Sequence, residues 1–124
     1  MNVTWNVVFD NEFAAEVEAF DPAVQTELLA CARLLEQFGP HLARPWADTL
    51  KGSRHPNMKE LRFSAAGGAW RAAFAFDPAR KAVLLVAGDK SGGSDRRFYR
   101  RLIRTADKRF DAHLARVAQK GRKT

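Results

Sequence analysis

Three strand-like segments follow one another in the middle of the chain, and this feature limits the possible folds more than any other. Apolar residues alternate with charged or small ones in 60–63 and 70–76, and 82–87 is a continuous apolar run. The alternation is typical of half-buried strands, and the continuous run of a strand covered on both faces. The connecting turns, 65–68 and 77–80, are short enough for hairpins. The pattern predicts an antiparallel meander.

The segment before the meander predicts a strand followed by two helices. Val3 to Phe9 is strand-like, Asp10-Asn11 can cap a short helix, and Asp21-Pro22 can begin a second one. Gly39-Pro40 ends the second helix. We expect residues 41–57, rich in Pro, Gly, His and Trp, to be irregular. The apolar positions of the two helices are Phe13, Val17 and Phe20, and then Val24, Leu28, Cys31, Leu35 and Phe38.

A Gly-rich loop, 88–93, leads into a last helix that begins near Asp95 and has one apolar and one basic face. The predicted order is β-α-α-β-β-β-α, an α+β fold with helices grouped on a sheet. With 124 residues the chain forms one domain, which we place at 1–118, followed by a basic flexible tail at 119–124.

The positive charge is concentrated at the C-terminal end. Residues 95–124 hold 11 Lys and Arg against 3 Asp, whereas residues 1–94 hold 10 Lys and Arg against 11 Asp and Glu. This asymmetry indicates a polyanionic or acidic partner, or alternatively only a solvated helix with a basic tail.

Several functional classes receive no support. No apolar run is long enough to cross a bilayer, and the N-terminus lacks the basic and then apolar pattern of a secretion signal. The single cysteine, Cys31, lies in an apolar helical pattern and is expected in the core. His41, His55 and His113 are far apart in sequence and have no cysteine partners, so we expect no metal site and no cofactor. We expect a cytoplasmic protein that does not contact membranes.

Basic side chains and one tyrosine are expected to gather on one face of the sheet. Arg62 and Arg71 lie on adjacent strands and alternate with apolar neighbours, so both point away from the main apolar row. We expect this face to be an open groove that binds a phosphodiester and a splayed base. The other candidate RNA-binding residues are Lys51, Arg54, His55, Lys59, Arg96, Arg97, Arg100, Arg101 and Arg104.

Such a set suits RNA cleavage without a metal. The ribose 2′-OH is an internal nucleophile, so the protein needs only to position it, move protons and stabilise charge on the phosphate. A lysine surrounded by cations can act as the base because its pKa falls. The alternative is structural: Arg62 and Arg71 can be the solvated face of a sheet, and Tyr99 can lie at the core edge.

Five segments of the chain resemble the Gp49-like (HigB-type) branch of the RelE/ParE toxin superfamily. The likeness covers roughly residues 3–115, and the order of strands, loops and basic helix agrees. The segments are Asp48-Thr49-Leu50-Lys51-Gly52-Ser53, Lys59-Glu60-Leu61-Arg62, Gly68-Ala69-Trp70-Arg71-Ala72-Ala73-Phe74, Val86-Ala87-Gly88-Asp89-Lys90 and Phe98-Tyr99.

This resemblance implies a type II toxin that cleaves mRNA in the ribosomal A site without a metal. It also implies a cognate antitoxin, which in HigA-like cases carries a helix-turn-helix domain. The implied catalytic residues are Arg71, Lys90 and Tyr99. The family's second lysine of the first meander strand corresponds to Glu60 here, so the base could instead be Lys51, Arg54 or His55.

Two alternative functions remain. ParE-type members share the fold but act on DNA gyrase, so the fold alone does not decide the activity. A non-catalytic nucleic-acid-binding accessory protein could also use the basic helix. Growth arrest on expression separates the accessory protein from both toxins.

Overall fold

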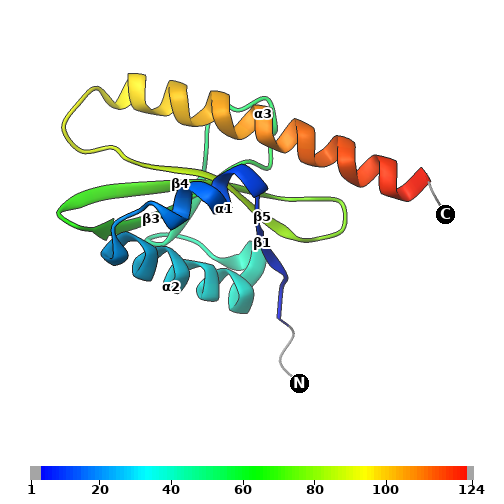
Figure 1. Ribbon diagram of the computed structural model, residues 1–124, viewed down its shortest axis with the longest axis horizontal. Coiled ribbons are helices and arrows are strands. Elements are labelled where there is room, and N and C mark those ends of the chain that lie inside the picture. Colours follow the sequence, from blue (N-terminus) through cyan, green and yellow to red (C-terminus); the bar gives the residue numbers. More distant parts are fainter. Residues whose placement is uncertain (1–3, 123–124) are drawn as a thin grey trace.

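The computed structural model describes residues 4–122 and shows a five-stranded mixed sheet between two layers of helices (Figure 1). The strand order is β1-β5-β4-β3-β2. The predicted meander is confirmed: β3, β4 and β5 are antiparallel neighbours, while β1 joins β5 in parallel. The strands are β1 (Val7–Phe9), β2 (Ala47–Thr49), β3 (Lys59–Ala65), β4 (Gly68–Phe76) and β5 (Ala82–Asp89).

The N-terminal helices, α1 (Asn11–Glu18) and α2 (Pro22–Phe38), cover one face of the sheet (Figure 1). Each begins after an aspartate whose carboxylate accepts hydrogen bonds from first-turn amides, as predicted. Asp10 accepts from Glu12 N and Phe13 N at 3.1 and 3.2 Å, and Asp21 accepts from Ala23 N at 2.8 Å. These carboxylates satisfy amides that have no partner inside the helix.

The predicted apolar stripe of α2 is buried except at its end. Val24, Leu28 and Leu35 are at most 1% exposed. Cys31 is also in the core, where burial and then the negative charge of Glu27 raise its pKa to about 11, so the thiol stays protonated. The expected core position of Phe38 is wrong, because Phe38 is 45% exposed. The next buried position after Leu35 is Gly39, four residues later, so the side chain of Phe38 faces solvent.

A two-residue turn fixes the pairing of β3 with β4. Ala66 and Gly67 have positive φ angles of 50° and 75°, as a tight type I′ hairpin requires. The turn pairs Ala65 with Gly68, and the same register places Arg62 opposite Arg71. The two arginines therefore share a face, as predicted.

The region 41–57 was expected to be irregular, but it contains a strand. Ala47–Thr49 forms β2 and pairs with Lys59–Leu61 at the edge of the sheet. A short 3-10 helix, η1 (Gly39–His41), precedes it. The strand was missed because three residues, Ala-Asp-Thr, carry no readable alternation. The first strand is also shorter than predicted: β1 begins at Val7, and Val3 lies outside the described residues.

The last helix, α3 (Asp95–Arg122), packs on the opposite face of the sheet, so the sheet is covered on both sides (Figure 1). Ala73 and Ala75 of β4 are fully buried beneath α3. Their small side chains let the helix lie close to the sheet. The helix continues past residue 118, where we placed the end of the domain. No described helix is long and apolar enough to cross a membrane.

Two histidine–aspartate pairs hold the middle of α3 against the rest of the fold. His113 Nε2 lies 2.8 Å from Asp77 Oδ2 in the turn after β4, and His55 Nε2 lies 2.7 Å from Asp111 Oδ1. Phe110 contacts both imidazole rings and is 2% exposed. Burial opposes ionisation of Asp77, but hydrogen bonds from His113 and Lys81 N outweigh it and lower the pKa of Asp77.

Replacing Asp77 by asparagine is expected to lower the free energy of unfolding by about 1 kcal/mol at pH 7. A carboxyl group whose folded pKa is lowered contributes stability above its unfolded value, near 4, and loses it as the pH falls through the folded value. The difference between wild type and Asp77→Asn should therefore shrink below about pH 4 in urea titrations. A difference unchanged between pH 7 and pH 3 would show that the Asp77 carboxylate does not contribute this stability. Glu18→Gln, at an exposed position, is the control.

Candidate active site

Arg71 is buried, which corrects the expectation of an exposed residue on an open groove. Its residue exposure is 8%, because α3 covers most of this face of the sheet. Arg71 Nη1 donates to Trp70 O at 2.9 Å. Its Nε lies 3.9 Å from Glu60 Oε1 and has no hydrogen-bond partner within the described part of the chain. A buried donor without a partner is costly, so Nε is an unsatisfied polar atom held near the Glu60 carboxylate.

Glu60 and Tyr99 complete a buried cluster with Arg71. Tyr99 Oη donates to Glu60 Oε1 at 2.9 Å, and Glu60 is 6% exposed. Burial and then the hydrogen bond to Glu60 raise the pKa of Tyr99, and the nearby Arg71 only partly offsets them. The phenol therefore stays neutral and keeps its proton. Glu60 is a member of this cluster that was not predicted from the sequence. The pattern that could have indicated it is a carboxylate two residues before Arg62, on the same face of the strand.

A surface pocket of about 370 Å³ lies beside this cluster. Arg44, Arg62 and Arg71 line it together with Ser64 and Ala69. Arg44 also pairs with Asp48 at 2.7 Å and remains 72% exposed. Three arginines lining one small pocket favour an anion the size of a phosphate. Arg44 comes from the loop before β2, and no sequence pattern indicated it.

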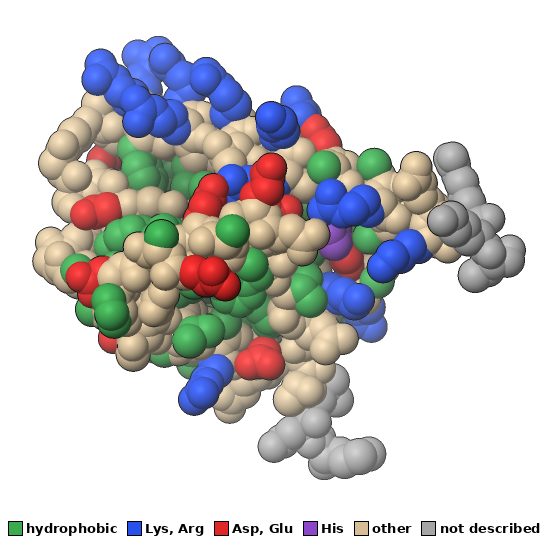
Figure 2. Space-filling view, in the orientation of Figure 1, with side chains coloured by type: hydrophobic (Ala, Val, Ile, Leu, Met, Phe, Trp, Pro, Cys, Tyr) green, Lys and Arg blue, Asp and Glu red, His purple; other side chains and the backbone are tan. Residues whose placement is uncertain are grey.

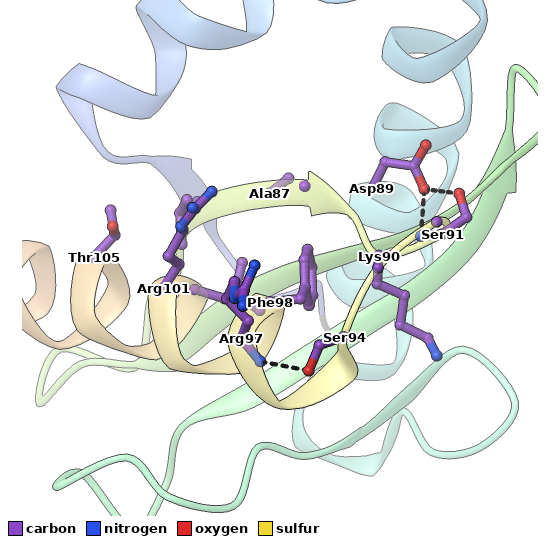
Figure 3. A pocket seen from close by; sticks show the side chains of 14 residues that line it. Ala87, Asp89, Lys90, Ser91, Ser94, Arg97, Phe98, Arg101 and Thr105 are labelled. Atoms are coloured by element: carbon purple, nitrogen blue, oxygen red, sulfur yellow. Dashed lines mark hydrogen bonds between the residues drawn. The ribbon is translucent and has the colours of Figure 1, made fainter.

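Lys90 lies near this pocket but outside the cluster. Its backbone N donates to Ala69 O at 2.8 Å, which places it next to a residue that lines the pocket. Its Nζ lies 3.4 Å from Asp95 Oδ2 at the start of α3. Figure 3 shows the side chain directed away from Arg97 and Arg101.

The structure does not bring the 51–59 candidates to the cluster. Arg54 and His55 both bind Asp111 of α3, and these hydrogen bonds lower the pKa of Asp111. Lys51 is exposed, and Lys59 Nζ reaches Pro40 O at 3.4 Å on the opposite face of the sheet. The loop holds α3 in place, which makes Arg54 and His55 poor candidates for the base.

Five arginines cover the first turns of α3 and are all exposed. None of them forms an ion pair within the described residues. Figure 2 shows Lys and Arg side chains gathered over this half of α3, and Asp and Glu side chains in the region of the N-terminal helices. The five residues are Arg96, Arg97, Arg100, Arg101 and Arg104.

Residues 15–111 match the family described as phage derived protein Gp49-like (DUF891). The chain belongs to the Gp49-like family. Two relatives from Mycobacterium tuberculosis (strain ATCC 25618 / H37Rv) agree with this assignment. The putative toxin HigB2 is 43% identical over 103 residues, which cover 82% of this chain and 51% of HigB2. The putative toxin HigB3 is 50% identical over 82 residues, 66% of this chain and 69% of HigB3. This Gp49-like chain thus spans about half the length of HigB2.

Solved structures show that this Gp49-like chain has the RelE fold. A mutant of Escherichia coli toxin RelE in the free state superimposes with a TM-score of 0.59 at 11% identity, covering 81% of this chain and 94% of RelE. The toxin–antitoxin complex RelBE2 from Mycobacterium tuberculosis contains a chain with a TM-score of 0.54 at 14% identity, covering 74% and 98%. The predicted HigB-type resemblance and α+β fold are confirmed.

Proposed function

We propose that this protein is the toxin of a type II toxin–antitoxin pair and that it cleaves mRNA on the ribosome. The observation that carries the proposal is the Arg71–Glu60–Tyr99 cluster, which borders a pocket lined by three arginines. This arrangement offers a phosphate site, a charge-stabilising donor, a carboxylate and a neutral phenol side by side. The family membership and the two HigB relatives support the same function.

The proposed reaction is attack of a ribose 2′-OH on the adjacent phosphate. Arg44 and Arg62 hold the phosphate in the pocket, and Arg71 stabilises the charge that builds on its oxygens. The new bond joins the 2′-oxygen to phosphorus, and the bond to the 5′-oxygen breaks, which leaves a 2′,3′-cyclic phosphate. Because the nucleophile belongs to the substrate, the reaction needs no metal and no cofactor.

Glu60 is the proposed base that takes the proton of the 2′-OH, in place of the lysine expected from the resemblance. Tyr99 orients the carboxylate by its hydrogen bond at 2.9 Å. Lys90, whose backbone lies beside Ala69 of the pocket and whose Nζ lies 3.4 Å from Asp95 Oδ2, is the proposed donor to the leaving 5′-oxygen. Proton transfers of this kind typically contribute 10²–10⁴-fold in rate.

The exposed arginines of α3 are proposed to bind RNA and the ribosome, since exposed cations without acidic partners attract phosphates. Lys51, Arg54, His55 and Lys59 lie away from the cluster, and for them we propose only RNA contacts outside it. We further propose a cytoplasmic protein whose folded toxin domain is residues 1–118. Its partner is a cognate antitoxin with a helix-turn-helix domain, and the RelBE2 complex is a toxin–antitoxin pair on the same fold.

Removing one 2′-OH from the mRNA tests the proposed chemistry. A single 2′-deoxy nucleotide on the 5′ side of a mapped cut should abolish cleavage there, because the nucleophile is gone. The same substitution one nucleotide downstream should leave the cut unchanged. The unmodified product should end in a 2′,3′-cyclic phosphate, detectable by mass spectrometry. Continued cleavage at the 2′-deoxy position would refute the mechanism.

A further inference from the structure

Trp46 is an aromatic side chain that the core does not use. It lies in the turn before β2 and is 47% exposed, and its indole packs on no other ring or cation among the described residues. The other two tryptophans differ, because Trp5 packs against Phe76 and Trp70 packs against Phe63. Burial in the core therefore does not explain an indole at this position, and its flat face is open to a ligand.

A pocket of about 400 Å³, which we call the Trp46 pocket, is lined by Trp46 and by residues of α2 and β3. Ala30 and Leu34 of α2 and Phe63 of β3 make its walls largely apolar. Among the described residues that line it, Glu27 is the only acidic one. The volume lies within the range of sites for small molecules, and apolar walls with a few polar groups are typical of such sites.

The Trp46 pocket adjoins the smaller pocket lined by Arg44, Arg62 and Arg71. Four residues line both pockets, among them Arg62 and Ser64 of β3. Arg62 N donates to Trp46 O at 2.8 Å, which holds the turn against this edge of the sheet. Only a sugar separates the phosphate of a nucleotide from its base, so a phosphate held by the three arginines brings a base to the Trp46 pocket.

Glu27 determines which edge of a base fits the Trp46 pocket. Its carboxylate accepts hydrogen bonds and cannot donate them. The charge acts on the wall of the pocket: after burial, Glu27 is the second cause that raises the pKa of Cys31, which lines the same pocket. An acceptor of this kind suits the exocyclic amino group of cytosine, adenine or guanine, whereas uracil presents a carbonyl oxygen there.

We propose that the Trp46 pocket binds one of the two bases that flank the phosphate held by Arg44, Arg62 and Arg71. The base stacks on Trp46 and donates a hydrogen bond from its exocyclic amino group to Glu27. A nucleobase is apolar on its faces and polar at its edge, which matches an indole beside a carboxylate. The proposal rests on the proposed RNA cleavage and extends it, because it assigns residues that select the base at the cut.

Binding of the deoxydinucleotide d(CC) to the purified protein tests the site without cleavage, because this probe lacks the 2′-OH. It should shift the NMR signal of the Trp46 indole N–H, which Trp46→Phe identifies by removing it. Trp46→Ala should weaken binding, measured at the Ser64 amide, at least about tenfold, as the loss of base–aromatic stacking does. Phe38→Ala is the control. Its ring is 45% exposed but lines neither pocket, so binding should stay within about twofold of wild type.

Comparison of d(CC) with d(UU) tests the role of Glu27, because cytosine and uracil have the same ring size and differ in the group that meets the carboxylate. Wild type should bind d(CC) at least about fivefold more tightly. Glu27→Ala should reduce this preference below about twofold, because the acceptor is gone. Glu36→Ala, at an exposed position of the same helix that does not line the pocket, should keep the preference.

Three results would overturn the proposal: the Trp46 indole signal does not move with d(CC), Trp46→Ala and Phe38→Ala bind alike, or wild type binds d(CC) and d(UU) equally well. These results are separate from the test of RNA cleavage. Wild type that cuts mRNA without a shift at Trp46 refutes this site alone. Wild type that binds d(CC) at Trp46 but leaves mRNA intact supports the site and refutes the nuclease.

Discussion

Arg71→Ala is expected to lower single-turnover cleavage of ribosome-bound mRNA by about 10²–10³-fold, because one donor to the developing phosphate charge is lost. The same change should also destabilise the fold. Glu60 would remain buried with Tyr99 as its hydrogen-bond donor but without the nearby positive charge, and breaking a buried pair costs about 3 kcal/mol or more. Both effects are measurable, by cleavage on programmed ribosomes and by urea unfolding.

Arg71→Lys separates the two effects. A lysine keeps a positive charge near Glu60 but cannot present the planar guanidinium to a phosphate. We expect a folded protein that still loses about 10²-fold in rate. Arg116→Ala, on the exposed distal part of α3, should cleave as wild type does and is the control. Wild-type cleavage by folded Arg71→Lys would show that Arg71 has only a structural role.

Glu60→Gln is expected to lower the same rate by about 10²–10⁴-fold, since an amide cannot take the proton of the 2′-OH. Glutamine has nearly the same shape and can still accept a hydrogen bond from Tyr99. Removing the carboxylate also removes the partner of Arg71, so the melting temperature must be measured in parallel.

Comparing Tyr99→Phe with Glu60→Gln separates the positioning role proposed for Tyr99 from the role of Glu60 as the base. If Tyr99 only orients the carboxylate, its loss should cost a smaller factor than Glu60→Gln and should leave the shape of the pH–rate profile unchanged. Glu60→Gln should instead abolish the rise of rate with pH that a carboxylate base produces. A Glu60→Gln protein that cleaves at the wild-type rate would remove Glu60 from the mechanism.

Local chemistry made much of the fold predictable from the sequence. Asp10 and Asp21 mark the starts of α1 and α2, and the alternation in β3 and β4 fixes Arg62 and Arg71 on one face. The sequence did not show which face of the sheet α3 covers. The small side chains of Ala73 and Ala75 allow close helix packing, but they do not by themselves identify the element that covers them.

The candidate site was only partly predictable for a related reason. Arg71 and Tyr99 were assigned, but their partner Glu60 was treated as a departure from the family pattern and not as a member of the site. Arg54 and His55 were assigned to RNA, because the sequence cannot show that Asp111 of α3 lies within hydrogen-bond distance of them. Contacts over more than fifty residues of chain depend on how α3 docks, and no local pattern encodes that.

Mapping mRNA ends shows whether this protein cuts mRNA on the ribosome. Purified protein is added to ribosomes programmed with a defined mRNA, and the 5′ ends are located by primer extension. We expect new ends within the codon in the A site, present with the wild type and absent with Arg71→Lys. Intact mRNA under these conditions, with growth still arrested on expression, would contradict it and point to another target such as DNA gyrase.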